Sequence, residues 1–445
     1  MRIVIVAVGS RGDVQPCVAL ALGLDQAGFE VRLAAPARFR GLGVEHGVAF
    51  DSLPIDPSAL LEGDVGRAWV ESGRSPTAFR RGLLDMAEPM WERLADAILE
   101  ACMDADAVVY TTLGSTAWHV AQAHKVPAIQ ATFSPVNPTA AFPPMLLASA
   151  FKGIDPWQRT PAGALARSYH RASHWLFAQM LWLPLRRWVN HWRRTRLDLP
   201  ALGLTSPALQ VAHDGEPLLC AFSPAVLRPP RDWGPNVVTT GYWFLPPAPG
   251  WRPPDRVAAF LAADPPPVSI GIGSMTGRRP AEFVAIAVDA LRRTGQRGVL
   301  LSGWAHLGSG DIHATAADVD LLVADEVPHD WLLGRVSAAV HHGGAGTTGA
   351  SLRAGAPTVI IPHFADQPLW GDRVHALGAG PAPIPRAQLT PARLAHAIAA
   401  AVHDERICTR AVAVSEAINA EDGVGRAVEH ITSVLEAATE AGRTT

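Results

Sequence analysis

The chain has 445 residues, 48% of them hydrophobic and 18% charged, and its formal net charge is −3 at pH 7. This length exceeds what one hydrophobic core ordinarily serves, so two domains are expected. The near-neutral charge argues against a nucleic-acid partner, and no apolar run reaches the roughly twenty residues that span a bilayer. Four separated cysteines without a CxxC pair indicate a reducing, cytoplasmic compartment and argue against a structural zinc site.

The beginning of the chain alternates buried strands with helices. Residues 2–8 predict a strand rather than a signal peptide, because the apolar run is short and leads directly into a glycine turn at 9–13. A helix is expected from Val14 to Ala27, and a second strand at 31–35. The alternation continues with a strand at 106–110, a helix at 116–123 and a strand at 127–132. This pattern predicts a doubly wound parallel sheet.

The segment at about 140–210 breaks this alternation and is rich in tryptophan, arginine and histidine. Trp175, Gln179, Trp182 and Arg186 follow one another at helical spacing. The tryptophans either form the core of a helical insertion or, alternating with basic residues, contact a membrane surface weakly. Pro184 is expected to interrupt the helix, which makes membrane contact the less favoured interpretation.

A proline-rich stretch at 246–254 is the best domain boundary in the chain. Before it, strands are expected at 218–222 and 237–240. After it, a second alternation is predicted, with strands at 268–272, 298–301 and 321–323, a first helix at 281–293 and a last helix at about 426–437.

The second half contains a strand, glycine loop, helix, strand unit between Ala338 and Ile361. The loop occupies residues 341–346, and the helix is expected from Thr347 to Ala354. Small residues let a phosphate approach the backbone, and the first N–H groups of the helix point at it. Asp366 and Gln367 follow the second strand, where ligands of parallel sheets bind. A carboxylate beside an amide is suited to vicinal sugar hydroxyls.

Three motifs together resemble the family 1 glycosyltransferases of the GT-B fold, in the antibiotic, macrolide and sterol glucosyltransferase branch. They are HHGGAGTT at 341–348, PHFADQPLWG at 362–371 and GSRGDV at 9–14. The resemblance implies an α/β fold with two Rossmann-like doubly wound parallel-sheet domains facing across a cleft. It also implies a UDP- or TDP-sugar as co-substrate, with no metal or other cofactor.

The resemblance also implies a domain plan. An acceptor-binding domain would occupy 1–245, with the insertion at about 140–210 covering the acceptor pocket as a third interpretation of that segment. The linker would be 246–264, and the nucleotide-sugar domain 265–425. The residues at 426–445 would cross back to the first domain as a helix and tail.

By the same resemblance, His342, Gly344, Gly346 and Thr347 contact the donor diphosphate, and Asp366 and Gln367 bind the sugar hydroxyls. Three further donor contacts are implied at Ser274, Trp304 and the backbone near Val327. Alternatives remain for several residues. His341 is assigned to finishing its strand, Asp366 could cap the helix that follows, and Trp304 could be a buried residue that ends a strand.

Asp13 is the implied general base, because no histidine stands between Met1 and Phe39. It would accept the proton of an acceptor hydroxyl as that oxygen attacks the anomeric carbon. The structural alternative is an N-cap for the helix expected at Val14. Ser10 either orients the base or acceptor or is a plain turn residue.

We therefore expect an inverting hexosyltransferase that moves a sugar, glucose in the first instance, to a hydroxyl of a hydrophobic acceptor. Two alternatives are a non-catalytic nucleotide-sugar-binding scaffold and an NAD-dependent Rossmann oxidoreductase. The turn GSRGD lacks the GxGxxG of the latter. The pairs Asp104–Asp106 and Asp318–Asp320 look like DxD metal motifs, but both precede strands and are interpreted as turns. The sequence leaves the acceptor and the oligomeric state open.

Overall fold

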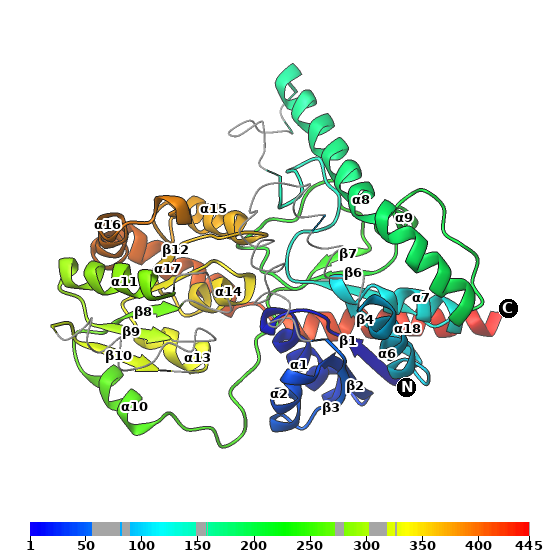
Figure 1. The fold of residues 1–445 in the computed structure, drawn as a ribbon, viewed down its shortest axis with the longest axis horizontal. Coiled ribbons are helices and arrows are strands. Elements are labelled where there is room, and N and C mark those ends of the chain that lie inside the picture. The colour runs from blue at the N-terminus through cyan, green and yellow to red at the C-terminus, as the bar shows by residue number, and fades with distance from the viewer. Residues whose placement is uncertain are drawn as a thin grey trace. The chain divides into compact units, whose positions relative to one another are not determined.

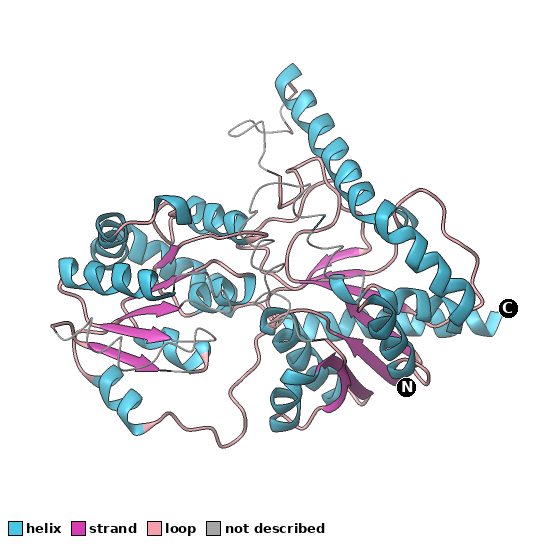
Figure 2. Cartoon of the chain, in the orientation of Figure 1, coloured by secondary structure: helices cyan, strands magenta, loops and turns pink. Residues whose placement is uncertain are grey.

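The computed structural model describes residues 1–55, 81, 90–147, 157, 159–271, 280–301, 318–324 and 327–444. The chain divides into two compact units (Figure 1). The first unit comprises residues 1–224, 228–245 and 422–445, and the second comprises 225–227 and 246–421. In each unit, helices cover the strands of one sheet (Figure 2).

In the described residues of the first unit, seven parallel strands form one sheet in the order β3-β2-β1-β4-β5-β6-β7. The central strand β1 pairs on both sides, with Ile3 opposite Val31 and Ala107. Ile3, Val4, Ile5 and Val6 are fully buried, which explains why the strand reads as a continuous apolar run. The strands are β1 Arg2–Val6, β2 Glu30–Pro36, β3 Ala49–Leu53, β4 Ala107–Thr111, β5 Ala128–Thr132, β6 Leu218–Cys220 and β7 Val237–Thr239.

Helices α1 and α18 pack closely together in the first unit. A Cβ atom added at Gly23 of α1 would lie 2.5 Å from Val424 Cγ1 of α18, so the contact requires glycine. The helices of this unit are α1 Arg11–Gln26, α2 Arg40–Glu45, α6 Trp91–Ala101, α7 Thr116–His124, α8 Pro161–Arg196, α9 Pro207–Asp214 and α18 Gly423–Thr444.

Helix α8 corrects one prediction, since it continues through Pro184 without interruption from Pro161 to Arg196. Proline removes one backbone hydrogen bond from a helix. Side chains beyond it hold the helix in place by bonding backbone carbonyls of the segment that follows the helix. Asn190 Nδ2 donates to Leu202 O at 3.0 Å, and Arg193 Nε donates to Pro200 O at 3.1 Å.

The described residues of the second unit contain five parallel strands in the order β10-β9-β8-β11-β12. Val340 of β11 lies opposite Ile270 of β8 and Val359 of β12. The strands are β8 Val268–Gly271, β9 Gly298–Leu301, β10 Leu321–Ala324, β11 Ala338–His341 and β12 Thr358–Ile360. The helices are α10 Asp255–Ala262, α11 Pro280–Thr294, α13 His329–Leu332, α14 Ala345–Arg353, α15 Gln367–Leu377, α16 Pro391–His403 and α17 Glu405–Asn419.

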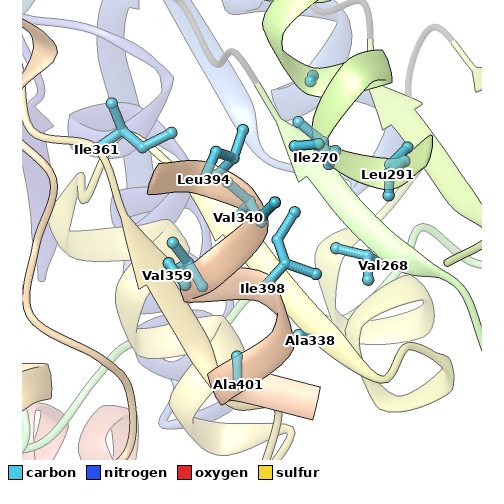
Figure 3. Packing of buried hydrophobic residues seen from close by; sticks show 14 of the residues in the cluster. Val268, Ile270, Leu291, Ala338, Val340, Val359, Ile361, Leu394, Ile398 and Ala401 are labelled. Carbon is cyan, nitrogen blue, oxygen red and sulfur yellow. The ribbon is translucent and has the colours of Figure 1, made fainter. Parts of the chain in front are cut away.

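The core of this unit lies between the sheet and helices α11 and α16. Thr390 begins α16 as its N-cap, accepting a hydrogen bond from Arg393 N at 3.3 Å. Leu394 and Ile398, four residues apart, place their side chains against the strand residues Val340 and Val359 (Figure 3). This packing fixes the carboxyl end of β11, where the glycine loop begins.

Residues 255–262, expected inside the linker, form helix α10. Val257 and Leu261 of α10 are buried in a cluster with Val299 of β9 and Leu332 of α13. The helix therefore packs as part of the second unit.

Candidate functional site

The glycine loop connects β11, which ends at His341, to α14, which begins at Ala345. The helix thus starts two residues before the predicted Thr347, with Gly344 as its N-cap. The first backbone hydrogen bond of the helix runs from Thr348 N to Gly344 O at 2.9 Å. The N–H groups of Ala345, Gly346 and Thr347 therefore have no carbonyl partner within the helix, as in any helix start. They form a site suited to an anion.

Gly343 is required by its backbone and by its surroundings. Its φ is +90°, a conformation that side chains rarely adopt. A Cβ atom here would lie 2.6 Å from Ile360 Cγ2 and 3.2 Å from Gln367 O. The glycine therefore brings the loop against β12 and the start of α15.

His342 lies directly over the loop, because a Cβ atom at Gly344 would be only 2.6 Å from its Nε2. Among the described residues, its buried Nδ1 atom has no hydrogen-bond partner. Burial, with a smaller contribution from nearby His329, lowers the pKa of His342 to about 4. The imidazole is thus neutral near pH 7 without ligand, so it offers a hydrogen-bond donor rather than a cation.

His341 does more than finish its strand, the role assigned to it from the sequence. It is buried, and its Nδ1 accepts the N–H of Gly343 at 3.0 Å. This bond places the ring proton on Nε2, which faces Ser351 Oγ at 3.3 Å. Ser351 Oγ in turn donates to Thr348 O at 3.0 Å. His341 therefore ties the glycine loop to α14 and is a positioning residue that sequence reasoning missed.

The signal for His341 in the sequence is weak. Two adjacent histidines stand where a strand meets the glycine loop, and the pattern does not show which backbone group each ring contacts. Burial lowers the pKa of His341 well below its ordinary value, with His342 and His329 adding to the effect. Its partner Ser351 lies ten residues further along, at a spacing that no motif marks.

Gln367 is the first residue of α15, and its side chain is 5% exposed. Its Oε1 accepts the backbone N–H groups of His363 at 2.8 Å and Phe364 at 3.3 Å. This holds the loop after β12 in a fixed shape and leaves the amide NH₂ to donate elsewhere.

Asp366 precedes α15 but makes no side-chain cap bond, which was its structural alternative. Instead its Oδ2 accepts the indole N–H of Trp370 at 2.7 Å. Ala365 beside it has a φ of +56°, an uncommon conformation for alanine. A carboxylate and an amide are thus held side by side on a strained loop, an arrangement suited to hydroxyl groups of a sugar.

Asp13 lies in the first turn of α1, which begins at Arg11 and not at Val14. Ser10 is the N-cap, and Asp13 is the third helical residue of a capping box. Asp13 Oδ2 accepts the N–H of Ser10 at 2.7 Å and its hydroxyl at 3.0 Å. Ser10 therefore orients the Asp13 carboxylate. This geometry gives Asp13 a structural role and leaves its predicted role as a base to experiment.

The remaining predicted donor contacts are two residues that lie outside the described residues and Val327, which lies beside such residues. Ser274 and Trp304 lie outside the described residues. Val327 is 7% exposed and packs in the cluster with Leu332, so only its backbone could contact a base. Close by, the ring of Trp331 packs edge-on against Trp251, and Arg335 lies over its face.

The two DxD-like pairs are engaged by arginines. Asp104 forms ion pairs with Arg2 and Arg32, and Asp318 with Arg292. Asp320 lies 2.5 Å from Arg297 Nε. In the part of the chain that the structure describes, no group of three or more His, Cys, Asp or Glu side chains could hold a metal ion.

Two family models match the chain. The glycosyltransferase family 28 N-terminal domain matches residues 3–143, and the C-terminal domain of erythromycin biosynthesis protein CIII-like proteins matches residues 310–430. The second match spans the glycine loop and the Asp366–Gln367 pair.

Curated relatives align along nearly the whole chain. Sterol 3-beta-glucosyltransferase UGT80A2 of Arabidopsis thaliana is 36% identical over 96% of the chain and 65% of its own length. UGT80B1 of the same plant is 34% identical over 96% of the chain and 67% of its own length. A sterol 3-beta-glucosyltransferase of Emericella nidulans is 34% identical over 99% of the chain. The chain spans about two thirds of the plant proteins but only 30% of the fungal one.

Solved structures agree on the fold. The glycotransferase of kitacinnamycin has a TM-score of 0.66 at 21% identity, covering 98% of this chain and 99% of the other. Glycosyltransferase VinC, solved in complex with DTDP, has the same TM-score at 17% identity, covering 98% and 100%. The predicted two-domain parallel α/β fold is confirmed, and so is the resemblance drawn from the three motifs. The chain belongs to the family 1 glycosyltransferases of the GT-B fold.

Proposed function

We propose that this chain transfers a hexose, glucose in the first instance, from a UDP- or TDP-sugar to a hydroxyl of a hydrophobic acceptor such as a sterol or a macrolide. The relatives named above are sterol glucosyltransferases, and a structural neighbour binds DTDP. The observation that carries the proposal is His342. It is a neutral histidine with a buried, unpartnered Nδ1 among the described residues, directly beside the N–H groups that begin α14.

The donor half of the proposed reaction uses residues of the second unit. The N–H groups at the start of α14 and the ring of His342 would donate hydrogen bonds to the diphosphate. Charge accumulates on this group as its bond to the sugar breaks, so these donors stabilise the transition state. Asp366 and Gln367 would hold the sugar hydroxyls. No metal ion is needed in this scheme, because the helix start and His342 bear the developing charge.

The acceptor half uses Asp13. Its carboxylate would take the proton of the acceptor hydroxyl while that oxygen forms a bond to the anomeric carbon and the bond to the diphosphate breaks. A single displacement of this kind inverts the anomeric configuration, so a UDP-α-glucose donor gives a β-glucoside.

The cysteines in the described chain are all free, which supports work in a reducing, cytoplasmic compartment.

Thermal unfolding with UDP, UDP-glucose, TDP, TDP-glucose and NAD, each at saturation, tests the donor half. A ligand at a hundred times its Kd adds about 2.7 kcal/mol to the free energy of unfolding. We expect a shift with UDP or TDP compounds and none with NAD. Stabilisation by NAD alone would instead support the oxidoreductase, and no shift with any nucleotide would contradict a working donor site.

Variants of His342 sharpen this test. His342→Ala should weaken nucleotide binding about tenfold and lower kcat by about 10²–10³, the effect of removing one transition-state donor. His342→Asn keeps an amide N–H at the place of Nδ1 and should recover part of the loss. His396→Ala on α16 is the matched control, since His396 is exposed. Equal affinity in all three variants would remove His342 from the site.

A scaffold that binds nucleotide sugars without turnover is the second candidate. It shares the donor half, so nucleotide shifts alone do not separate the two. Release of UDP or TDP in the presence of a sterol separates them, because a scaffold binds the donor and leaves it intact.

A further inference from the structure

Several side chains of helix α8 anchor it to its own unit by hydrogen bonds. Gln179 Nε2 donates to Leu204 O at 2.9 Å, and Trp182 Nε1 donates to Gly203 O at 3.3 Å. Towards the N-terminal end, the rings of His170 and His174 bond the carbonyls of Ala140 and Phe142. These polar and aromatic side chains therefore make their contacts inside the unit.

Helix α8 also carries an exposed apolar stripe, defined here as Leu165, Ala172, Leu176 and Leu183. These residues are spaced by seven, four and seven positions, so at about 100° per residue they fall within roughly 40° of one another. The three leucines are 59%, 61% and 50% exposed. At about 1.5 Å per residue the stripe is roughly 27 Å long.

Trp175 lies beside the stripe and is 55% exposed. Of the ten large hydrophobic side chains that are exposed in the described residues, four belong to α8. Figure 1 shows the N-terminal part of this helix extending away from the strands of its unit. Such a concentration marks a contact surface, because single exposed leucines are usually scattered.

The charge of α8 indicates the kind of partner. The helix contains seven arginines and no aspartate or glutamate, although the whole chain has a net charge of −3. Arg187 and Arg194 continue the line of the stripe, at four and eleven residues after Leu183, and both are exposed. Arg193 is buried inside the unit, and Arg196 pairs with Asp96. Arg187 and Arg194 thus extend the apolar stripe with positive charge.

We propose that the stripe of α8 docks on the surface of an anionic lipid membrane. The leucines would enter the boundary between headgroups and acyl chains, with Trp175 at the headgroup level and Arg187 and Arg194 against lipid phosphates. A second copy of the chain is a poorer partner, because its α8 offers more arginines and no carboxylate. In the described part of the chain, no helix is long and apolar enough to cross a membrane. This docking is independent of the sugar transfer proposed above.

Sedimentation of the full chain with vesicles tests the proposal. The vesicles contain phosphatidylcholine alone or phosphatidylcholine mixed with phosphatidylglycerol, each at low and high salt. We expect binding to the anionic vesicles that weakens at high salt. The double variant Leu176→Asp/Leu183→Asp should lose at least about tenfold in vesicle affinity. Arg187→Glu/Arg194→Glu should also lose about tenfold or more, on anionic vesicles only.

The matched control is Leu113→Asp/Val412→Asp, which places the same charges at two exposed apolar positions outside α8. It should bind vesicles as the parent does. Each variant is checked by circular dichroism and by its thermal shift with UDP, so a failed donor site is seen separately from a failed membrane contact. A parent chain that ignores anionic vesicles, or stripe variants that bind as well as the control, would overturn the proposal. So would a dimer in sedimentation velocity that the stripe variant abolishes while vesicles bind neither form.

Discussion

Replacing Asp13 by asparagine distinguishes a helix cap from a general base. In the capping box, Asp13 Oδ2 accepts two hydrogen bonds from Ser10, at 2.7 and 3.0 Å. The amide oxygen of asparagine can accept both. The fold then loses mainly the attraction between a carboxylate and the start of α1, about 0.3–1 kcal/mol. For domains of this size, that loss lowers Tm by about 1–4 °C.

The expected loss of activity is much larger. A general base contributes about 10²–10⁴ in rate, and an amide cannot take the proton. Ser10→Ala is the companion variant: it removes the N-cap side chain at a cost of about 1 kcal/mol but keeps the carboxylate. The two variants should therefore have similar Tm values, while their kcat values differ by about a hundredfold or more.

The assay is the initial rate of UDP or TDP release with a sterol acceptor, measured beside thermal unfolding of the same preparations. An Asp13→Asn enzyme that keeps its rate within a few-fold of the parent would refute the reasoning. Asp13 would then be a cap alone, and the base would have to be sought elsewhere.

Three further predictions concern the glycine loop and the buried histidines. Gly343→Ala should lower the free energy of unfolding by about 1–3 kcal/mol, because Gly343 has a positive φ and an added Cβ would meet Ile360. Gly346→Ala is the control in the same denaturant titration. It has open space around it and should be neutral or slightly stabilising. His341→Ala should weaken the binding of UDP or TDP in calorimetry. His341→Asn keeps an acceptor for the N–H of Gly343 and should restore much of that affinity. Equal losses of affinity in the two variants would leave His341 a purely structural role. Burial and Arg193 lower the pKa of His119 to about 3, below its unfolded value near 6.5, so the stability it contributes is present above pH 6.5 and is lost as pH falls towards 3. Between pH 7 and pH 5 this loss is about 2 kcal/mol, and His119→Asn should lose that much less; identical acid sensitivity of parent and variant would contradict the assignment.

The parallel sheets and the loop could be predicted because their signals are local. Residues 3–6 of strand β1 are fully buried, so the apolar run is continuous, and the glycine loop is marked by three glycines and an alanine at 343–346. The starts of α1 and α14 were placed two or three residues late. The residues missed are Arg11, Gly12 and Asp13 in α1 and Ala345 and Gly346 in α14, which carry no apolar periodicity.

Tertiary contacts decided what the sequence could not show. Helix α8 passes through Pro184 because side chains such as Asn190 and Arg193 anchor it to the segment at 200–202. The network of His341 joins a strand end, a loop and Ser351 across ten residues. Asp366 Oδ2 accepts the indole N–H of Trp370 rather than a helix N–H, and Ala365 beside it has a positive φ. The motifs at 341–348 and 362–371 mark some of these residues, but they do not show which hydrogen bonds hold the side chains in place.

Transfer of radiolabelled glucose from UDP-glucose, and then from TDP-glucose, to a sterol in the presence of the purified chain tests the central claim most directly. The account predicts that label enters the organic extract at the same rate as UDP or TDP is released, and that NMR shows a β configuration of the product. In His342→Ala, both the label transfer and the UDP or TDP release should be lost. Donor that binds and stabilises the chain yet stays intact with every hydrophobic acceptor offered would contradict the claim and leave a nucleotide-sugar-binding scaffold.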